Sequence, residues 1–208
     1  MAIRTAFIAT FLAALTAAAS AQEISGARYP DVGAADQKLS QLLEDERAGR
    51  GSGLGMVLVD AMIEGLICRK VDIVIAGTVD GQTRTTTLLG STRVFGTLAY
   101  AGPKTLPIGK FVIASLVCHH GGGRRNFVGP HAKFQVRRGE FADLGTLRLV
   151  YRSDGFFTTT GATHRSIEAM NQERIVKLTE NAPKLMKKLV RRPMTLIGPA
   201  EGTVRTRL

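Results

Sequence analysis

Four histidines are the side chains best suited to metal chemistry in this chain of 208 residues. His119 and His120 are adjacent, whereas His131 and His164 stand further along the chain. Adjacent residues of a strand point to opposite faces, so neighbouring histidines rarely hold one ion together. A zinc site needs several converging ligands, and neither an H-x-x-x-H pair nor a carboxylate partner stands at the expected spacing. We therefore expect no metal site; the alternative is a small metal-assisted hydrolase that uses His119, His120 and His131.

A glycine-rich loop with two arginines follows the histidine pair. Residues 121–126 read GGGRRN, and glycine N–H groups together with the guanidiniums of Arg124 and Arg125 favour phosphate or carboxylate. The loop lacks the Gly-Lys-Ser/Thr ending of a phosphate-binding loop, and no helix obviously follows it. The pattern fits either an anion site or a solvated hairpin tip.

Other catalytic patterns are poorly represented. The sequence has no Gly-x-Ser-x-Gly nucleophile motif, and its acidic residues between 110 and 165 are only Glu140, Asp143 and Asp154. A cysteine thiol with His119 as its base is the remaining alternative, but neighbours in sequence need not have catalytic geometry. We expect a protein that is not an enzyme and holds no cofactor.

The first 21 residues have the features of a secretory signal peptide. Arg4 gives a basic start, residues 5–19 are almost unbroken apolar sequence, and Ala19-Ser20-Ala21 matches the A-x-A cleavage rule. The apolar run is shorter than the ~20 residues that a spanning helix needs, and no other stretch is long and apolar enough. Cleavage would place residues 22–208 in the periplasm or outside the cell; the alternative is an uncleaved N-terminal anchor.

Export affects the expectation for the two cysteines. Thiols tend to pair in an oxidising compartment, and a Cys68–Cys118 disulfide would close a loop of about 50 residues. In the chain-entropy view such a loop contributes about 4 kcal/mol to stability. Two buried free thiols are the alternative.

Positive charge is concentrated in the C-terminal half. The full chain carries +11, and residues 110–152 and 165–208 each carry +6 while residues 22–109 carry −1. A basic face attracts anionic partners, which for an exported protein are membrane surfaces, acidic glycans or extracellular DNA. The chain has no Trp and few other aromatics, which argues against specific nucleic-acid binding by stacking.

We therefore predict binding or structural association at the bacterial cell envelope, with an anionic component or a protein as partner. A basic face that only keeps the protein soluble is the alternative. The predicted anion-binding residues are Arg124, Arg125, Arg137, Arg138, Lys184, Lys187, Lys188, Arg191 and Arg192.

Short apolar runs separated by glycine, proline and aspartate dominate residues 56–152. Strands are predicted at residues 56–63, 71–77, 83–89, 94–100, 111–118, 133–137 and 145–152. Seven short strands with little helix between them favour an antiparallel sandwich or barrel over a βαβ fold. We expect a mainly β protein, an antiparallel β-sandwich with a C-terminal helical appendage.

Helices are expected on both sides of these strands. Residues 36–48 show helical spacing with Asp36 as the cap, and residues 50–55 form a flexible joint. Residues 166–192 have a helical pattern that Pro183 interrupts, so residues 183–192 form a short basic amphipathic helix. This helix either packs on the domain or lies on an anionic surface. The predicted organisation is a signal peptide (1–21), a leader, short helix and joint (22–55), a β-sandwich domain (56–152) and a helical extension (153–208).

Two segments resemble a known group of proteins. Residues 106–118 read LPIGKFVIASLVC and residues 134–147 read FQVRRGEFADLGTL. Both are similar to segments of small exported bacterial β-sandwich proteins of the carboxypeptidase-regulatory-like or transthyretin-like kind. The resemblance covers roughly residues 90–152. It implies a sandwich fold and carries over no catalytic residue.

Overall fold

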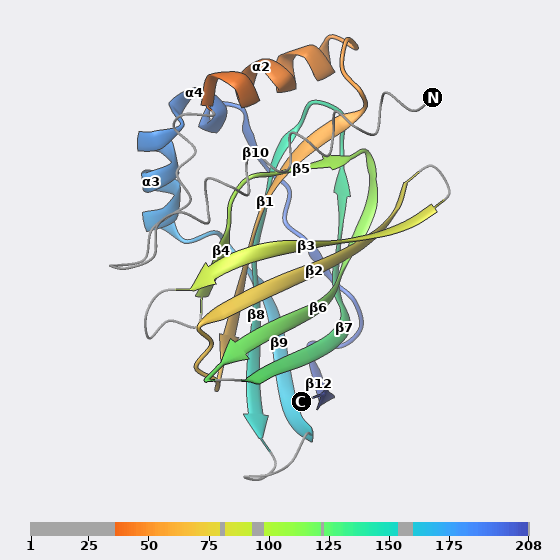
Figure 1. Cartoon of the computed structure of the whole chain (residues 1–208), viewed down its shortest axis with the longest axis vertical. Coiled ribbons are helices and arrows are strands. Elements are labelled where there is room, and N and C mark those ends of the chain that lie inside the picture. Colours follow the sequence, from red (N-terminus) through yellow and green to blue (C-terminus); the bar gives the residue numbers. More distant parts are fainter. Residues whose placement is uncertain (1–35, 80–81, 93–97, 122, 154–159, 208) are drawn as a thin grey trace.

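The computed structural model describes residues 36–79, 82–92, 98–121, 123–153 and 160–207. The predicted signal peptide (1–21) and the leader up to residue 35 lie outside this part of the chain. The described residues are mainly β, with a few short helices that gather at one end of the molecule (Figure 1). The expected fold class is confirmed at this level.

Three helices and twelve strands make up the described structure. The helices are α2 (Asp36–Arg47), α3 (Gln172–Asn181) and α4 (Pro183–Met186). The strands are β1 (Leu54–Glu64), β2 (Lys70–Val79), β3 (Gln82–Thr92), β4 (Leu98–Ala101), β5 (Lys104–Pro107), β6 (Gly109–His120), β7 (Gly123–Val136), β8 (Phe141–Ser153), β9 (Thr160–Glu168), β10 (Leu189–Arg191), β11 (Thr195–Leu196) and β12 (Glu201–Arg207).

The strand pairings form a closed path. Starting from β1, neighbouring strands are β8, β9, β12, β7, β6, β2, β3 and β4, and β4 pairs with β1 again. The β1–β8 pairing is parallel and extends from Met56 opposite Phe141 to Glu64 opposite Val150. In Figure 1, β2, β3 and β6 run obliquely across the view, whereas β1, β8 and β9 run nearly along the long axis.

The main hydrophobic core lies inside this closed sheet. Strand β2 buries every second side chain, including Val71, Ile73 and Ile75, as the period of a strand requires. Its partner β6 adds Ile113 and Leu116 to the same cluster. Because alternate residues point inward, the residues between them form the outer face of the sheet.

Strand β1 separates the main core from a second one. Val57, Val59 and Ala61 belong to the main core, whereas Met56 and Leu58 face the second cluster with residues of all three helices. The next residue on that face is Asp60, which forms an ion pair with Arg174 of α3. Both side chains are fully buried, so this charge pair joins the helices to the sheet away from water.

The predicted strands within 56–152 correspond to observed ones, with longer bounds in most cases. Of the strand predicted at 133–137, residues 133–136 are the last part of β7. Of the run predicted at 94–100, only residues 98–100 are described, within β4. The Cys68–Cys118 disulfide is confirmed, with the two Cα atoms 5.3 Å apart. It joins the segment between β1 and β2 to β6.

The N-terminal helix is confirmed, but its first residue has a different role from the one expected. The carboxylate of Asp36 accepts hydrogen bonds from the backbone N–H groups of Lys184 and Leu185 (3.2 and 2.7 Å), so it caps α4. Residues 50–55 were predicted to form a flexible joint, but hydrogen bonds hold this segment to α2. The buried carboxylate of Glu46 accepts from the N–H groups of Ser52 and Gly53 (2.7 and 3.0 Å).

The helical pattern predicted over residues 166–192 is only partly correct. The central part of this pattern is confirmed, because residues 172–181 form α3. Asn171 caps the first turn of α3 by accepting a hydrogen bond from the N–H of Arg174. Residues 166–168 instead belong to β9, and the predicted basic helix at 183–192 stops at Met186. Residues 189–191 then form β10, parallel to β8. The segment predicted as a helical extension thus contributes β9, β10, β11 and β12 to the sheet.

Candidate functional site: a basic groove

The outer face of the sheet carries two rows of side chains that cross several strands. In the first row, Thr83 of β3 is opposite Thr78 of β2, Thr78 is opposite Lys110 of β6, and Lys110 is opposite Gln135 of β7. Their neighbours Phe111 and Phe134 are buried, so these polar side chains point outward.

The second row lies beside the first. Ala76 of β2 is opposite Val112 of β6, Val112 is opposite Lys133 of β7, and Lys133 is opposite Thr195 of β11. Lys110 and Lys133 are diagonal neighbours on paired strands, which places their Cβ atoms roughly 7 Å apart. Two ammonium groups are therefore presented on one face.

These rows line a groove of about 850 Å³. No acidic side chain is among its described lining residues, but five basic ones are: Lys110, Lys133, Arg137, Arg191 and Arg192. The remaining lining is formed by Thr78, Thr83, Gln135 and Thr195, which can hydrogen-bond, and by small or apolar residues such as Ala76, Val112 and Pro193. The groove is a concave, positively charged surface with neutral hydrogen-bonding groups between the charges.

Most of the five cations are not neutralised by neighbours. Within the described ranges, Lys110, Lys133 and Arg137 make no side-chain hydrogen bond or ion pair, and all three are exposed. Arg192 is the exception, since its Nε lies 3.2 Å from Oε1 of Glu140.

Arg191 acts electrostatically on a carboxyl group behind the groove. Burial raises the pKa of Asp143, while the N–H of Gly145 and the charge of Arg191 act in the opposite direction. The Asp143 carboxylate accepts that N–H at 2.8 Å. The Arg191 charge therefore partly compensates a buried acid, and it remains on the groove lining.

The structure brings together only three of the nine predicted anion-binding residues, namely Arg137, Arg191 and Arg192. Arg138 lies 3.4 Å from the Glu46 carboxylate, and Lys188 lies 2.6 Å from that of Glu44. Lys184 and Lys187 are exposed at α4 and are not among the groove lining.

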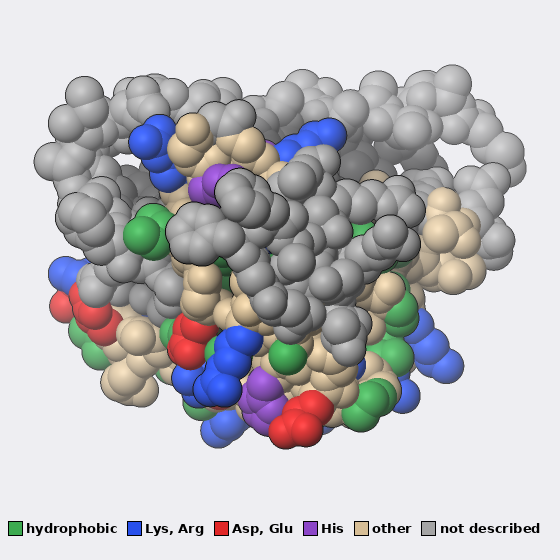
Figure 2. Space-filling view, turned by 90° about the horizontal axis from the view of Figure 1, so that it is seen from below, with side chains coloured by type: hydrophobic (Ala, Val, Ile, Leu, Met, Phe, Trp, Pro, Cys, Tyr) green, Lys and Arg blue, Asp and Glu red, His purple; other side chains and the backbone are tan. Residues whose placement is uncertain are grey.

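The other two predicted residues, Arg124 and Arg125, lie at the far end of the β6–β7 hairpin. Arg124 pairs with His119, nine residues along β6 from Lys110, which corresponds to about 30 Å. Arg125 stacks over the ring of Tyr151, 5.3 Å from its centre. On the end of the molecule shown in Figure 2, Lys and Arg side chains lie apart from one another with acidic side chains beside some of them.

The sequence analysis missed Lys110 and Lys133. Both follow from the strand period, because Phe134 and Val136 share one face and Lys133 and Gln135 the other. The antiparallel pairing of β6 with β7 then places Lys110 and Lys133 on the same outer face. The missing step was the assignment of that pairing.

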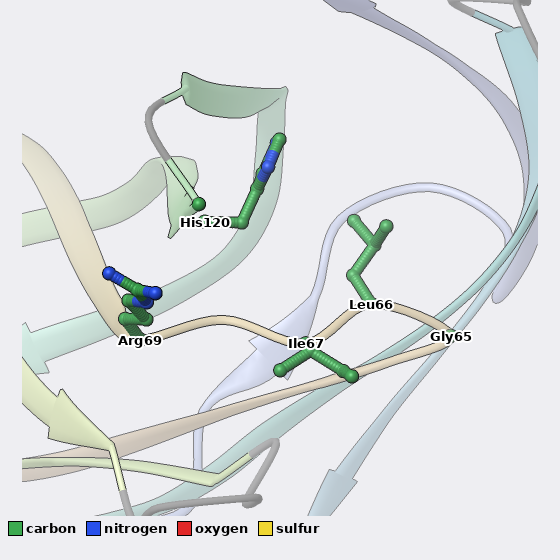
Figure 3. A pocket seen from close by; sticks show the side chains of 6 residues that line it. Gly65, Leu66, Ile67, Arg69 and His120 are labelled. Carbon is green, nitrogen blue, oxygen red and sulfur yellow. The ribbon is translucent and has the colours of Figure 1, made fainter.

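The histidines do not converge. His119 Nε2 lies 2.8 Å from the Asp72 carboxylate, and His120 lines a separate hollow of about 480 Å³ (Figure 3). His131 is buried, and its Nε2 donates to the carbonyl of Phe127 at 2.9 Å. Burial lowers the pKa of His131 and favours the neutral imidazole. Among the residues that the structure describes, no three His, Cys, Asp or Glu side chains form a group that could hold a metal ion.

Comparisons with known proteins give little similarity. No protein-family model matches the chain, and no curated protein matches it. Among solved structures, a leucine-rich repeat protein from Bacteroides thetaiotaomicron VPI-5482 is similar at 14% sequence identity with a TM-score of 0.35. The match covers 46% of this chain and 14% of that protein, and a similarity this low supports no conclusion about fold or function. None of the described helices has the length and apolar character needed to cross a bilayer.

Proposed function

We propose that the protein is an exported, non-enzymatic binding protein of the bacterial cell envelope whose groove holds an acidic glycan chain. The observation that carries this proposal is the groove lining, with five basic side chains and no acidic one among its described residues. A concave surface of one charge sign attracts a polyanion more strongly than the same charges dispersed over a convex surface.

The lining fits a carboxylated or phosphorylated glycan in particular. Lys110 and Lys133 offer point charges, whereas Arg137 and Arg191 offer planar guanidiniums that bind an oxyanion through two parallel bonds. The hydroxyl groups of Thr78, Thr83 and Thr195 can exchange hydrogen bonds with sugar hydroxyls. Pro193, Ala76 and Val112 supply small apolar surfaces against which a sugar ring can lie.

Two observations support the exported location. The first 21 residues have the pattern of a signal peptide, and Cys68 is bonded to Cys118, as expected in an oxidising compartment. We further propose that the closed sheet is a flattened sandwich, as its resemblance to exported bacterial sandwich proteins implies.

The proposal is tested by measuring binding of the full chain to fluorescent polygalacturonate by anisotropy at low and high NaCl. The groove variant is Lys110→Gln, Lys133→Gln and Arg137→Gln combined. Its matched control, Arg124→Gln, Lys184→Gln and Lys187→Gln combined, removes the same charge from predicted residues outside the groove.

We expect the groove variant to bind about tenfold more weakly than the wild type, and the control to stay within about twofold. Wild-type affinity should fall as salt rises, because the contacts are between exposed charges. Equal losses in the two variants would show that binding depends on net charge alone and would refute the groove. Salt-independent binding would refute the electrostatic basis.

A further inference from the structure

A second surface, at the other end of β6 from the groove, has a different chemistry. Ile67 is 75% exposed, whereas the other exposed large hydrophobic side chains of the described chain range from 36% to 48%. It precedes Cys68, whose disulfide holds the segment to β6. The exposed position is therefore fixed by a covalent bond one residue away.

The backbone around Ile67 is held on both sides. Gly65 has a φ of +86°, and a Cβ there would lie 2.0 Å from the carbonyl oxygen of Tyr151, so only glycine fits this turn. The N–H of Arg69 donates to the carbonyl of His119 at 2.7 Å. Leu66 packs against the main core, and Figure 3 shows Leu66 and Ile67 projecting to opposite sides of the loop. Ile67 is thus presented to solvent by a rigid segment.

Basic residues lie at the same end of the sheet as this isoleucine, where His119 is opposite Lys70 on one side and Arg124 on the other. We call residues 65–70, 119–121 and 123–125 the basic tip; they contain Arg69, Lys70, Arg124 and Arg125 and no acidic residue. The acidic residues nearest along the chain are Glu64, which pairs with Arg148 at 2.9 Å, and Asp72, which is 14% exposed and pairs with Lys70 and His119 (2.9 and 2.8 Å).

We propose that the basic tip is a contact site for an anionic phospholipid surface, with Ile67 entering the boundary between headgroups and acyl chains. Interfacial membrane anchors combine exposed aliphatic side chains with cations, and here Ile67 lies at the same end of the sheet as the exposed Arg69 and Arg124. Arg69 and Arg124 are both exposed beside His119, so their guanidiniums are available to bind lipid phosphates. The hollow lined by Leu66, Arg69 and His120 offers about 480 Å³ beside Ile67 for one headgroup.

The absence of tryptophan from the chain gives a direct probe. Ile67→Trp places a single indole at the tip, and Val176→Trp places one at a half-exposed apolar position of α3 as the matched control. With vesicles of phosphatidylglycerol in phosphatidylcholine, emission of the Ile67→Trp variant should shift to shorter wavelength, while the control should not. Vesicles of phosphatidylcholine alone should give no shift, because the cations then lack a counter-charge.

Vesicle flotation of the full chain measures how strongly the protein partitions onto the anionic vesicles. Ile67→Ser should lower partition onto the anionic vesicles by about tenfold and Arg124→Gln by about fivefold, whereas Val176→Ser and Lys187→Gln should leave it unchanged. All variants share residues 1–35, so any contribution of that segment cancels. An intact disulfide and unchanged circular dichroism verify folding.

Three results would overturn the proposal. One is equal partition onto neutral and anionic vesicles. Another is partition that Ile67→Ser leaves unchanged. The third is a lipid-independent blue shift of Ile67→Trp with rising protein concentration, which would assign the tip to contact between copies. The groove variant should float normally, so failure at the tip and failure at the groove are separable.

Discussion

The buried Asp60–Arg174 pair gives the sharpest prediction for stability. Arg174→Met removes the guanidinium and keeps an unbranched, apolar side chain in α3 that is about as long as the arginine up to its Nε. The cap of the helix is preserved, because Asn171 accepts from the backbone N–H of residue 174 rather than from its side chain. The change therefore acts on the charge pair between α3 and β1.

The magnitude follows from the burial of both partners. Each side chain has 0% exposure, so Arg174→Met leaves the Asp60 carboxylate shielded from bulk water and without its counter-charge. Leaving one charge of a buried pair without its partner costs about 3–5 kcal/mol. Replacing both charges by apolar side chains of similar volume is often neutral, so Asp60→Leu with Arg174→Met should recover most of the loss.

The assay is urea unfolding followed by circular dichroism, because the chain has no tryptophan. The free energy of unfolding is compared for the wild type, Asp60→Leu, Arg174→Met and the double variant. We expect each single variant to lose about 3–5 kcal/mol and the double variant to lose about 1 kcal/mol or less. Losses below 1 kcal/mol in the single variants, or additive losses in the double variant, would refute the reasoning.

Three further predictions concern the core. His131 has a lowered pKa, so below pH 6.5 the unfolded chain takes up a proton that the folded chain does not, and stability falls as pH decreases. Urea midpoints measured from pH 7 to pH 5 should therefore fall more for the wild type than for His131→Gln, and parallel curves would contradict this. The double variant Cys68→Ser with Cys118→Ser should lose about 4 kcal/mol of unfolding free energy relative to the oxidised wild type, and an unchanged urea midpoint would contradict it. Gly77→Ala should lose about 1–3 kcal/mol, because its Cβ would lie 2.2 Å from the buried ring of Phe111; a melting temperature equal to the wild type would show that the ring moves freely.

Local sequence patterns predicted the central strands because burial there follows the period of a strand. In the last part of β7, the buried Phe134 and Val136 alternate with the exposed Lys133 and Gln135, and the same alternation is visible in the sequence. The C-terminal strands carry no such signal. Residues 183–192 have helical spacing, yet β10 forms because residues 189–191 pair with 141–143 of β8. Tertiary pairing overrides the local preference there.

The candidate site was predictable only in part, because it too depends on how strands distant in sequence pair. Arg191 and Arg192 were selected by charge, but their neighbours across the groove, Lys110 and Lys133, are distant in sequence. Register places them together, and register depends on long-range pairing. Charge density along the chain also could not show that Arg138 and Lys188 face Glu46 and Glu44.

The closed strand path has a consequence for the order of folding. Strand β1 needs β8, and the gap between β9 and β7 is filled by β12, residues 201–207. Nearly the whole described chain must therefore be available before the closed sheet can form. The β2–β3 and β6–β7 hairpins can form earlier, because their strands are neighbours along the chain. Proteins dominated by such non-local pairings fold slowly. A chain that crosses a membrane from its N-terminus would remain open for the entire passage, and its last strand would complete the fold only on the far side.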